Sequence, residues 1–267
     1  MISHHIPTKA YQNDWELINE SKDSFFIAKI LKDNNFKHGF FTRSSQGKTI
    51  KDLSINLGQN ITIHEVNQIH SNLIIKAEQT NKRHVISADG ITSHSPNQSL
   101  WIYTADCIPV LIANSKSGNV SACHVGWRGV KERITINAIK KLTNKDKGVN
   151  QIYVAMGPSI SMKNYQVDLN TAQEIYRSLY NRKKLISLKV SAAIEKLHDL
   201  RIIDSDIEKN KVKLDIRLAL QEQLINEGLS YKQISICPLC TFDNECLFFS
   251  RRREKDKKVQ WSAIVSR

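Results

Sequence analysis

The stretch from residue 100 to residue 129 constrains the fold of this chain most strongly, and it reads LWIYTADCIPVLIANSKSGNVSACHVGWRG. Residues 100–103 and 110–113 form two apolar runs that are rich in β-branched and aromatic side chains and are too short for helices. Such runs predict buried strands. A third run, residues 120–125, follows a series of turn residues and predicts another strand. We therefore expect a sheet at the centre of the molecule.

Two reactive side chains stand at the ends of these predicted strands. Cys107 lies between the first two runs, and His124 lies near the end of the third. A sheet can hold a thiolate and an imidazole at a fixed separation, and functional sites are often built at strand ends. We therefore expect Cys107 and His124 to be neighbours in space.

The rest of the chain mixes strands and helices. Strands are predicted at residues 36–43, 53–58 and 151–156. Apolar side chains at helical spacing predict helices at residues 130–142, 171–180 and 214–227, and a weaker helical pattern covers residues 183–206. Asn170 and Gln173 are the predicted capping pair of the helix at 171–180. Without a repeat or a linker, this pattern predicts one α+β (mixed α/β) domain over residues 1–267, with a mixed sheet, flanking helices and its weakest pattern in residues 1–35.

Composition excludes several protein classes. Of the 267 residues, 40% are hydrophobic, which is typical of a globular protein. No apolar run approaches the ~20 residues of a membrane-spanning helix, and the N-terminal sequence lacks the apolar core of a signal peptide. An odd number of cysteines, five, indicates reduced thiols. These features predict a soluble, cytoplasmic protein without a membrane partner.

The formal net charge of +13 raises the question of an anionic partner. Most of this charge is lysine scattered along the chain, and the one long basic run covers residues 250–258. No zinc-finger, RNP or helix-turn-helix pattern accompanies the charge. A solvated, lysine-rich surface is therefore favoured over a nucleic-acid-binding protein, which stays as an alternative.

A CxxC motif near the C-terminus indicates a second metal site as an alternative. Cys237, Cys240 and Cys246 could bind one zinc ion as a knuckle. A closed structural zinc site needs four ligands, and no second CxxC or histidine pair follows. Buried or free thiols are therefore favoured at these three positions.

Ordered short motifs give the chain a resemblance to a known family. The motifs are FFTR at 40–43, SINLG at 54–58, QIH at 68–70, AD at 88–89, TADCIPV at 104–110, HVGWRG at 124–129, GP at 157–158, YQV at 165–167, CT at 240–241, and FFS followed by RR at 248–253. In this order they resemble the purine nucleoside phosphorylase family long labelled multicopper polyphenol oxidoreductase, or laccase-domain, proteins. TADC and HxGWRG at this spacing are the most specific of them.

This resemblance implies a zinc enzyme with a laccase-domain-like fold. The family's zinc ligands carry over to His70, Cys107 and His124, although the pattern around His70 alone favours a structural histidine. Three such ligands leave the fourth position open, as catalytic zinc sites do. The family is described as cleaving adenosine, inosine and methylthioadenosine with phosphate and as deaminating adenosine. The implied partners are purine nucleosides, phosphate and a second copy of the chain.

Phosphate binding and proton transfer both have candidate residues in the chain. Phosphate needs cationic donors, and the candidates are Arg43, Arg128 and Arg252. Arg43 alone would be taken as a surface arginine. Asp106, which precedes Cys107, is the candidate proton carrier or ligand-orienting residue, with a buried structural carboxylate as the alternative.

Three departures from the family pattern bear on activity. The interval from Gly58 to Gln68 is shorter than usual, which predicts a missing helix and an altered pocket wall. Ser159 and Gln166 replace the usual Cys and Glu. None of these changes removes a predicted zinc ligand.

A copper-dependent polyphenol oxidase is the rival enzyme, since copper is the alternative metal. Multicopper oxidases need a His-Cys-His centre and a three-copper cluster that takes about eight histidines. The chain has nine histidines in total and lacks the His-X-His pairs of such clusters. Zinc-dependent phosphorolysis is therefore the favoured prediction.

Overall fold

The computed structural model describes residues 14–20, 23–80, 85–143, 148–180, 190–255 and 257–267. Its first sheet has the strand order β1 (Trp15–Glu20), β2 (Asp23–Ala28), β3 (His38–Phe41), β15 (Gln260–Val265), β7 (Gln98–Thr104), β4 (Thr62–Glu65). The second has the order β14 (Ile234–Ile236), β10 (Ile152–Met156), β8 (Ile108–Asn114), β9 (Val120–Val125), β6 (Gly90–Thr92), β5 (Ile74–Lys76). A small third sheet has the order β11 (Gln166–Asp168), β13 (Lys211–Leu214), β12 (Ile203–Ser205). Parallel and antiparallel pairs occur in both large sheets, so the predicted mixed α/β class is confirmed.

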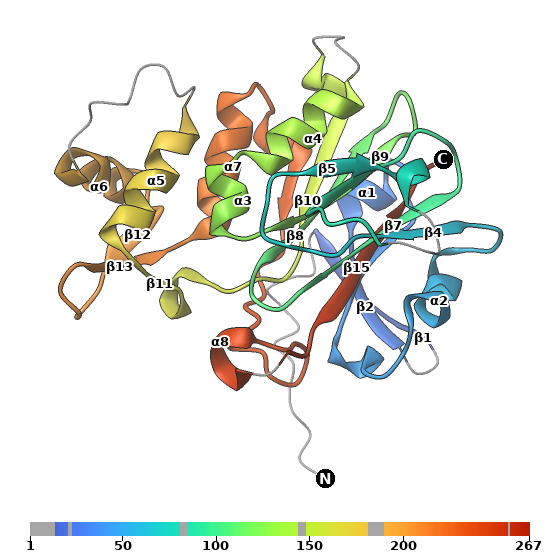
Figure 1. Ribbon diagram of the computed structural model, residues 1–267, viewed down its shortest axis with the longest axis horizontal. Coiled ribbons are helices and arrows are strands. Elements are labelled where there is room, and N and C mark those ends of the chain that lie inside the picture. The colour runs from blue at the N-terminus through green and yellow to red at the C-terminus, as the bar shows by residue number, and fades with distance from the viewer. Residues whose placement is uncertain (1–13, 21–22, 81–84, 144–147, 181–189, 256) are drawn as a thin grey trace.

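Helices lie on both sides of the paired large sheets. In chain order they are α1 (Lys29–Lys32), α2 (Ile50–Ser54), α3 (Trp127–Lys131), α4 (Ile134–Leu142), α5 (Leu169–Leu179), α6 (Val190–Asp199), α7 (Ile216–Asn226) and α8 (Arg251–Glu254). Figure 1 shows α3 to α7 gathered at one side of the molecule, with α2 on the opposite side and α8 apart from both groups.

Three apolar clusters fill the spaces between these layers, because strand side chains alternate between faces. In β8, Val110 and Ile112 pack toward helices α3 to α7, whereas Leu111 packs into the core between the two large sheets. In β7, Leu100 enters that same central core, whereas Trp101 faces the outer side of the first sheet. The central strands are therefore buried on both faces, as their continuous apolar runs predict.

Residues 53–58 correct one prediction, because they form no strand. They lie in α2 and in the 3-10 turn Ile55–Leu57, after a capping box in which Thr49 and Asp52 bond reciprocally. Leu53 and Leu57 are both buried, as expected four residues apart on one helical face, whereas Ile55 is 77% exposed. The period-2 alternation was misleading because it would have placed all three residues on one face.

The helical predictions need smaller corrections. The stretch 130–142 is split between α3 and α4, since Arg133 adopts the left-handed conformation with φ of 59°. Helix α5 is capped by Asp168, whose side chain accepts a 2.6 Å hydrogen bond from the Thr171 N–H, and not by Asn170. The weak pattern at 183–206 yields α6 and β12, with residues 183–189 outside the described part of the chain.

The other predicted elements are confirmed to within a few residues. The strands near 36–43 and 151–156 are β3 and β10. The helix at 214–227 is α7, with Asp215 as its N-cap and Gly228 beyond its end at φ of +98°. Gly58 to Gln68 holds the strand β4 and no helix, in line with its shortness. Within the described residues, no helix is long and apolar enough to cross a membrane.

Candidate metal centre

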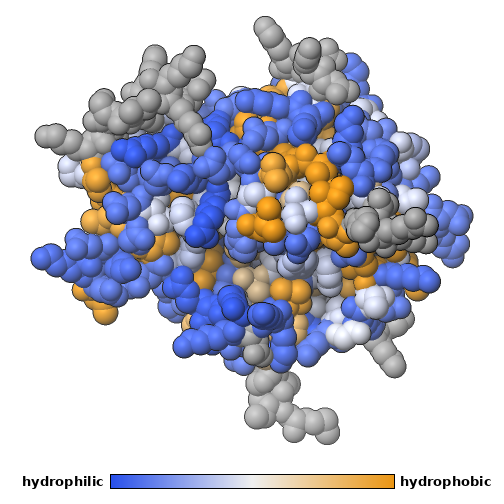
Figure 2. Space-filling model, in the orientation of Figure 1, coloured by the Kyte–Doolittle hydropathy of each residue, from blue (hydrophilic) through white to orange (hydrophobic). Residues whose placement is uncertain are grey.

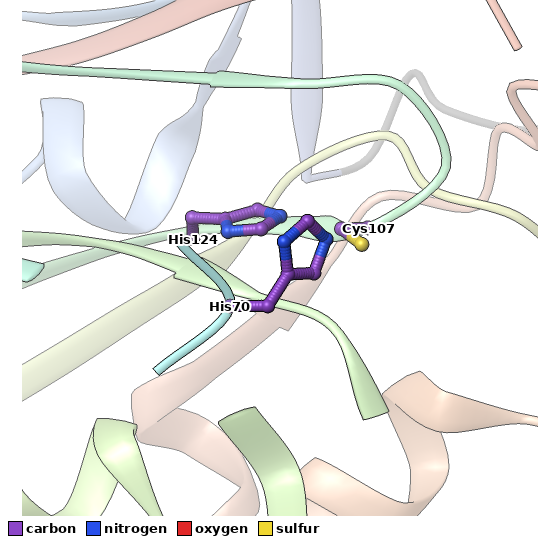
Figure 3. Close-up of side chains that lie close together, drawn as sticks. All are labelled: His70, Cys107 and His124. Atoms are coloured by element: carbon purple, nitrogen blue, oxygen red, sulfur yellow. The ribbon is translucent and has the colours of Figure 1, made fainter. Parts of the chain in front are cut away.

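Three side chains that the sequence places far apart meet at one end of the second sheet. Their metal-binding atoms, one from each of His70, Cys107 and His124, all lie within 4.8 Å of one another. Figure 3 shows the two imidazole rings and the thiol converging on one point. Cys107 immediately precedes β8 and His124 lies in β9, where Ile108 pairs with Val125 in antiparallel register. The expectation that Cys107 and His124 are neighbours is therefore confirmed.

His70 reaches this point from a loop between β4 and β5. Its backbone is left-handed, with φ of 59°, and its N–H donates a 3.0 Å hydrogen bond to Asp89 Oδ1. Asp89 also accepts hydrogen bonds from the backbone and hydroxyl of Ser71. The loop conformation that points His70 toward Cys107 is thus held by one buried carboxylate.

The same carboxylate orients the second histidine. Asp89 Oδ1 lies 2.8 Å from Nδ1 of His124, so the imidazole donates from Nδ1, and Nε2 is the nitrogen that would bind a metal after losing its proton. Histidine ligands of metals commonly donate their other ring nitrogen to a carboxylate, which fixes tautomer and orientation. Asp89 therefore supports both histidines from behind.

The surroundings of Cys107 lower the pKa of its thiol, which favours binding of a cation. Burial raises the pKa of the Cys107 thiol, but the hydrogen bonds and charges of His124 and His70 outweigh burial and lower it to about 7. Burial lowers the pKa of His124, whereas its bonds to Asp89 and Cys107 raise it to about 9. A thiolate is the form of cysteine that binds metal. Two imidazoles and one thiolate form a donor set that fits zinc, with the fourth tetrahedral position left open.

Gly126 gives the thiol its room. A Cβ at Gly126 would lie 3.0 Å from Sγ of Cys107 and 3.7 Å from Cδ2 of His70. The contact with sulfur would be tighter than normal packing allows, so the glycine of the GWRG motif is needed for this close approach.

A pocket of about 280 Å³ opens above the three ligands. Its lining residues, besides the three ligands, are Gln68, Tyr103, Thr104, Ala105, Arg251, Lys257, Lys258 and Val259. Tyr103 is fixed because its N–H and C=O both bond to the Gln68 side chain, at 2.8 and 2.7 Å. The pocket thus combines an aromatic residue, the ligand cluster and a basic wall. The basic wall consists of Arg251, Lys257 and Lys258. Small-molecule sites typically have this concave, mixed character.

None of the three predicted phosphate-binding arginines lines this pocket. Arg43 forms a 3.0 Å ion pair with Glu254 and lies over the Phe249 ring. Arg128 lies over the ring of Trp127, and Arg252 lies 5.5 Å from the centre of another ring, that of Tyr165. Their role in binding phosphate therefore stays a prediction.

Asp106 lies next to the cluster but outside the pocket lining. Its carboxylate accepts hydrogen bonds from the Thr241 hydroxyl at 2.6 Å, the Ser250 hydroxyl at 3.1 Å and the Arg252 N–H at 2.7 Å. The residue is buried, with φ of +87°. Both oxygens are thus bonded to donors of the C-terminal region, a geometry that suits an orienting role better than proton transfer.

Two groups of site residues were missed by the sequence reasoning. Asp89 enters the sequence analysis only as part of the AD motif at 88–89, because nothing in the sequence shows that its carboxylate faces His124. Arg251, Lys257 and Lys258 were seen only as part of a charge run. The available signal was their position in the run that follows the FFS motif, which leads directly into β15.

The three C-terminal cysteines do not form a zinc knuckle. The only cluster of metal-binding groups among the described residues is His70, Cys107 and His124. Cys237 is buried, and burial raises the pKa of its thiol to about 12. Sγ of Cys240 accepts a hydrogen bond from the Ser161 N–H at 3.3 Å, and Cys246 is exposed.

Comparison with known proteins defines the class to which this site belongs. The sequence profile of a family described as multi-copper polyphenol oxidoreductase laccase matches residues 46–266. A purine nucleoside phosphorylase of Synechocystis is 35% identical over 258 residues, covering 94% of this chain and 96% of the relative. A purine nucleoside phosphorylase of Rickettsia prowazekii is 25% identical over 203 residues, covering 75% of this chain and 74% of the relative.

Solved structures share the fold. YlmD from Geobacillus stearothermophilus superposes with a TM-score of 0.74 at 19% identity, over 94% of this chain and 98% of that one. The YfiH protein of Bacillus licheniformis gives the same TM-score at 20% identity, over 94% of this chain and 99% of that one. The chain therefore belongs to the laccase-domain family whose curated members include these purine nucleoside phosphorylases.

The metal-binding side chains give little support to the multicopper oxidase chemistry that the family description names. A multicopper oxidase needs a mononuclear centre and a three-copper cluster. The described residues provide one cluster of three metal-binding side chains. This cluster could serve one ion.

Proposed function

We propose that this protein is a zinc-dependent purine nucleoside phosphorylase, which cleaves adenosine and inosine with phosphate to a free base and ribose 1-phosphate. The observation that carries the proposal is the open His70, Cys107 and His124 cluster at the floor of a pocket with an aromatic side chain and a basic wall. The phosphorylase names of the Synechocystis and Rickettsia relatives support it.

The pocket's side chains match the parts of the substrates. Tyr103 lines the pocket, with its ring packed edge-on against that of Trp261, and every purine offers a face for stacking on such a ring. The basic side chains of the wall suit an anion that must be held close to the sugar. When bound, zinc would supply a Lewis acid that stabilises negative charge developing in the transition state.

The supporting residues maintain the geometry of the cluster. Asp89 accepts hydrogen bonds from the backbone N–H groups of His70 and Ser71 and from Nδ1 of His124. These bonds orient both imidazole rings, so that one nitrogen of each ring faces Cys107. Asp106 ties the Cys107 segment to the C-terminal region through three hydrogen bonds. Pre-positioned groups of this kind lower the reorganisation needed during reaction.

Chromatography of the reaction products tests this proposal. Zinc-loaded protein is incubated with adenosine or inosine, each with and without phosphate. We expect phosphate-dependent release of adenine or hypoxanthine that is lost in Cys107→Ala and retained in Cys246→Ala, which removes an exposed thiol outside the cluster. Absence of both free bases from the loaded wild-type reaction would refute the phosphorylase activity for these substrates.

The same chromatograms test two finer points. Methylthioadenosine is proposed as a third substrate, and deamination of adenosine to inosine as a second activity of the same site. Inosine formed from adenosine without phosphate, and lost in Cys107→Ala, would support the deaminase. Loading the protein with copper in place of zinc tests the metal, and we expect the lower activity with copper.

A further inference from the structure

Among the described residues, the pocket above the metal ligands is lined by basic side chains and by no carboxylate. Arg251, Lys257 and Lys258 all line it, and no described Asp or Glu does so. Cations concentrated on one wall of a concave site attract anions and hold them by charge-assisted hydrogen bonds. An anionic ligand is therefore favoured on this wall.

The buried hydroxyl of Thr104 lies in the same pocket as these basic side chains. Thr104 lines the pocket and is 2% exposed, and its Oγ1 has no hydrogen-bond partner among the described residues. Buried polar groups are nearly always bonded to protein, water or ligand. Thr104 thus offers an unused donor beside the basic wall.

Hydrogen bonds hold together the two ends of the chain segment that carries the basic wall. The segment of residues 249–255 and 257–260, here named the basic loop, is tied at its base by hydrogen bonds between the Gln260 side chain and the backbone of Phe249, at 2.8 and 3.2 Å. Gln260 pairs directly with Thr104 across β15 and β7. The unpartnered hydroxyl therefore lies at the base of the basic loop.

The basic loop is also fastened to the metal ligand's segment. The Arg252 N–H and the Ser250 hydroxyl both donate to Asp106, the residue before Cys107. The Arg253 guanidinium donates to the carbonyls of Thr241 and Phe248 at 2.8 and 2.7 Å. One buried carboxylate thus fixes the distance between the basic loop and the metal site.

From this arrangement we propose that Thr104, Arg251, Lys257 and Lys258 bind the phosphoryl oxygens of orthophosphate beside the metal centre. The proposal rests on the proposed function, because orthophosphate is the second substrate of phosphorolysis. Asp106 is then a positioning residue that sets the basic loop relative to Cys107.

The reaction balances with the groups named. An oxygen of dihydrogen phosphate forms a bond to C1′ of the nucleoside as the bond from C1′ to N9 breaks. The electron pair of the broken bond leaves with the purine, and the proton lost by phosphate ends on the purine. No oxidant or reductant is required.

Calorimetric titration of orthophosphate into zinc-loaded protein tests the site without turnover. We expect Lys257→Gln combined with Lys258→Gln to weaken binding about tenfold or more, and Thr104→Val to weaken it roughly fivefold. Lys255→Gln is the matched control, because Lys255 belongs to the basic loop but does not line the pocket, and its affinity should stay within about twofold of wild type. Circular dichroism establishes that each variant is folded.

Two results would overturn the proposal. One is unchanged phosphate affinity in both the double lysine variant and Thr104→Val. The other is adenosine 5′-monophosphate binding more tightly than orthophosphate while adenosine blocks orthophosphate, because the wall would then serve a nucleotide's own phosphate.

Steady-state kinetics separates this inference from the proposed function. If the wild type cleaves inosine and the double lysine variant raises the KM for phosphate with the KM for inosine unchanged, both stand. If the KM for phosphate is also unchanged, only the phosphate site fails. If the wild type cleaves no nucleoside but the variant loses phosphate binding, only the enzymatic proposal fails.

Discussion

Asp89 Oδ1 lies 2.8 Å from Nδ1 of His124, and the same oxygen accepts the backbone N–H of His70 at 3.0 Å. One carboxylate thus fixes a side chain on β9 and a loop that approaches from β4. Burial raises the pKa of the Asp89 carboxyl. The hydrogen bonds from His124 and Ser71 outweigh burial and lower this pKa to about 2. Asp89 is therefore ionised throughout the neutral range.

Replacing Asp89 by Asn tests this support. The amide keeps the shape but loses an acceptor and the charge, so we expect zinc affinity to fall about 10- to 100-fold. Competition with a chromophoric chelator measures the change. Asp52→Asn, which alters the exposed capping box of α2, is the control and should leave affinity unchanged. Equal affinities in Asp89→Asn and wild type would contradict the role assigned to Asp89.

Cys107 is expected to be essential for metal retention. Cys107→Ala leaves two imidazoles, which hold zinc poorly, so the zinc content after dialysis should drop from about one ion per chain to below roughly a tenth. Elemental analysis by mass spectrometry gives this number. Cys246→Ala serves as the matched thiol control, since Cys246 is exposed and outside the cluster. Full zinc occupancy in Cys107→Ala would show that the ion binds elsewhere.

Gly126 is expected to be intolerant of a methyl group. In Gly126→Ala the new Cβ would lie 3.0 Å from Sγ of Cys107, so the thiolate must shift and zinc affinity should fall about tenfold. In Gly148→Ala the new Cβ meets no atom within 4 Å, so this variant should bind zinc normally. Titration against a chelator compares the two proteins. A normal affinity in Gly126→Ala would mean that the Cys107 segment is freely adjustable.

A buried histidine outside the site should give stability a marked pH dependence. His38 accepts the Ala28 N–H on Nε2 and bonds to the Phe36 carbonyl through Nδ1, both at 2.8 Å, so both ring nitrogens are used in the neutral form. Burial lowers its pKa from 6.5 to about 4, although the bond to the Phe36 carbonyl opposes the shift. Between these values the unfolded chain holds a proton that the folded chain lacks.

Above pH 6.5, His38 is neutral in both the folded and the unfolded chain, so it does not lower the free energy of unfolding. As the pH drops from 6.5 to 4, the free energy of unfolding should fall. The expected contribution is about 1.4 kcal/mol per pH unit across this window. Urea unfolding at a series of pH values measures it. In His38→Gln this part of the slope should disappear, whereas an identical slope would place the titrating group elsewhere.

Much of the central architecture follows from sequence because the apolar runs of β7, β8 and β9 are buried on both faces. The neighbouring positions of Cys107 and His124 follow from the same strands. His70 was assigned through resemblance alone, because its direction depends on a left-handed backbone and on Asp89, which lies 19 residues further along the chain. Local sequence contains neither piece of information.

The basic side chains that line the pocket are harder to predict, since the direction of a long side chain depends on its partners. Arg43 is drawn away by Glu254 and the Phe249 ring, and neither partner is near it in sequence. Lysines at 257 and 258 looked like ordinary solvated charge. Hydrophilic side chains cover most of the face shown in Figure 2, so composition alone could not single them out.

The central claim is that phosphate itself is the nucleophile, and phosphorus NMR tests it most directly. Zinc-loaded protein is incubated with inosine and orthophosphate, and the spectrum is followed together with hypoxanthine release. We expect a ribose 1-phosphate signal that grows in equal amount with hypoxanthine and is missing in Cys107→Ala. Hypoxanthine released without any new phosphorus signal would show that water is the nucleophile, and that result would contradict the account.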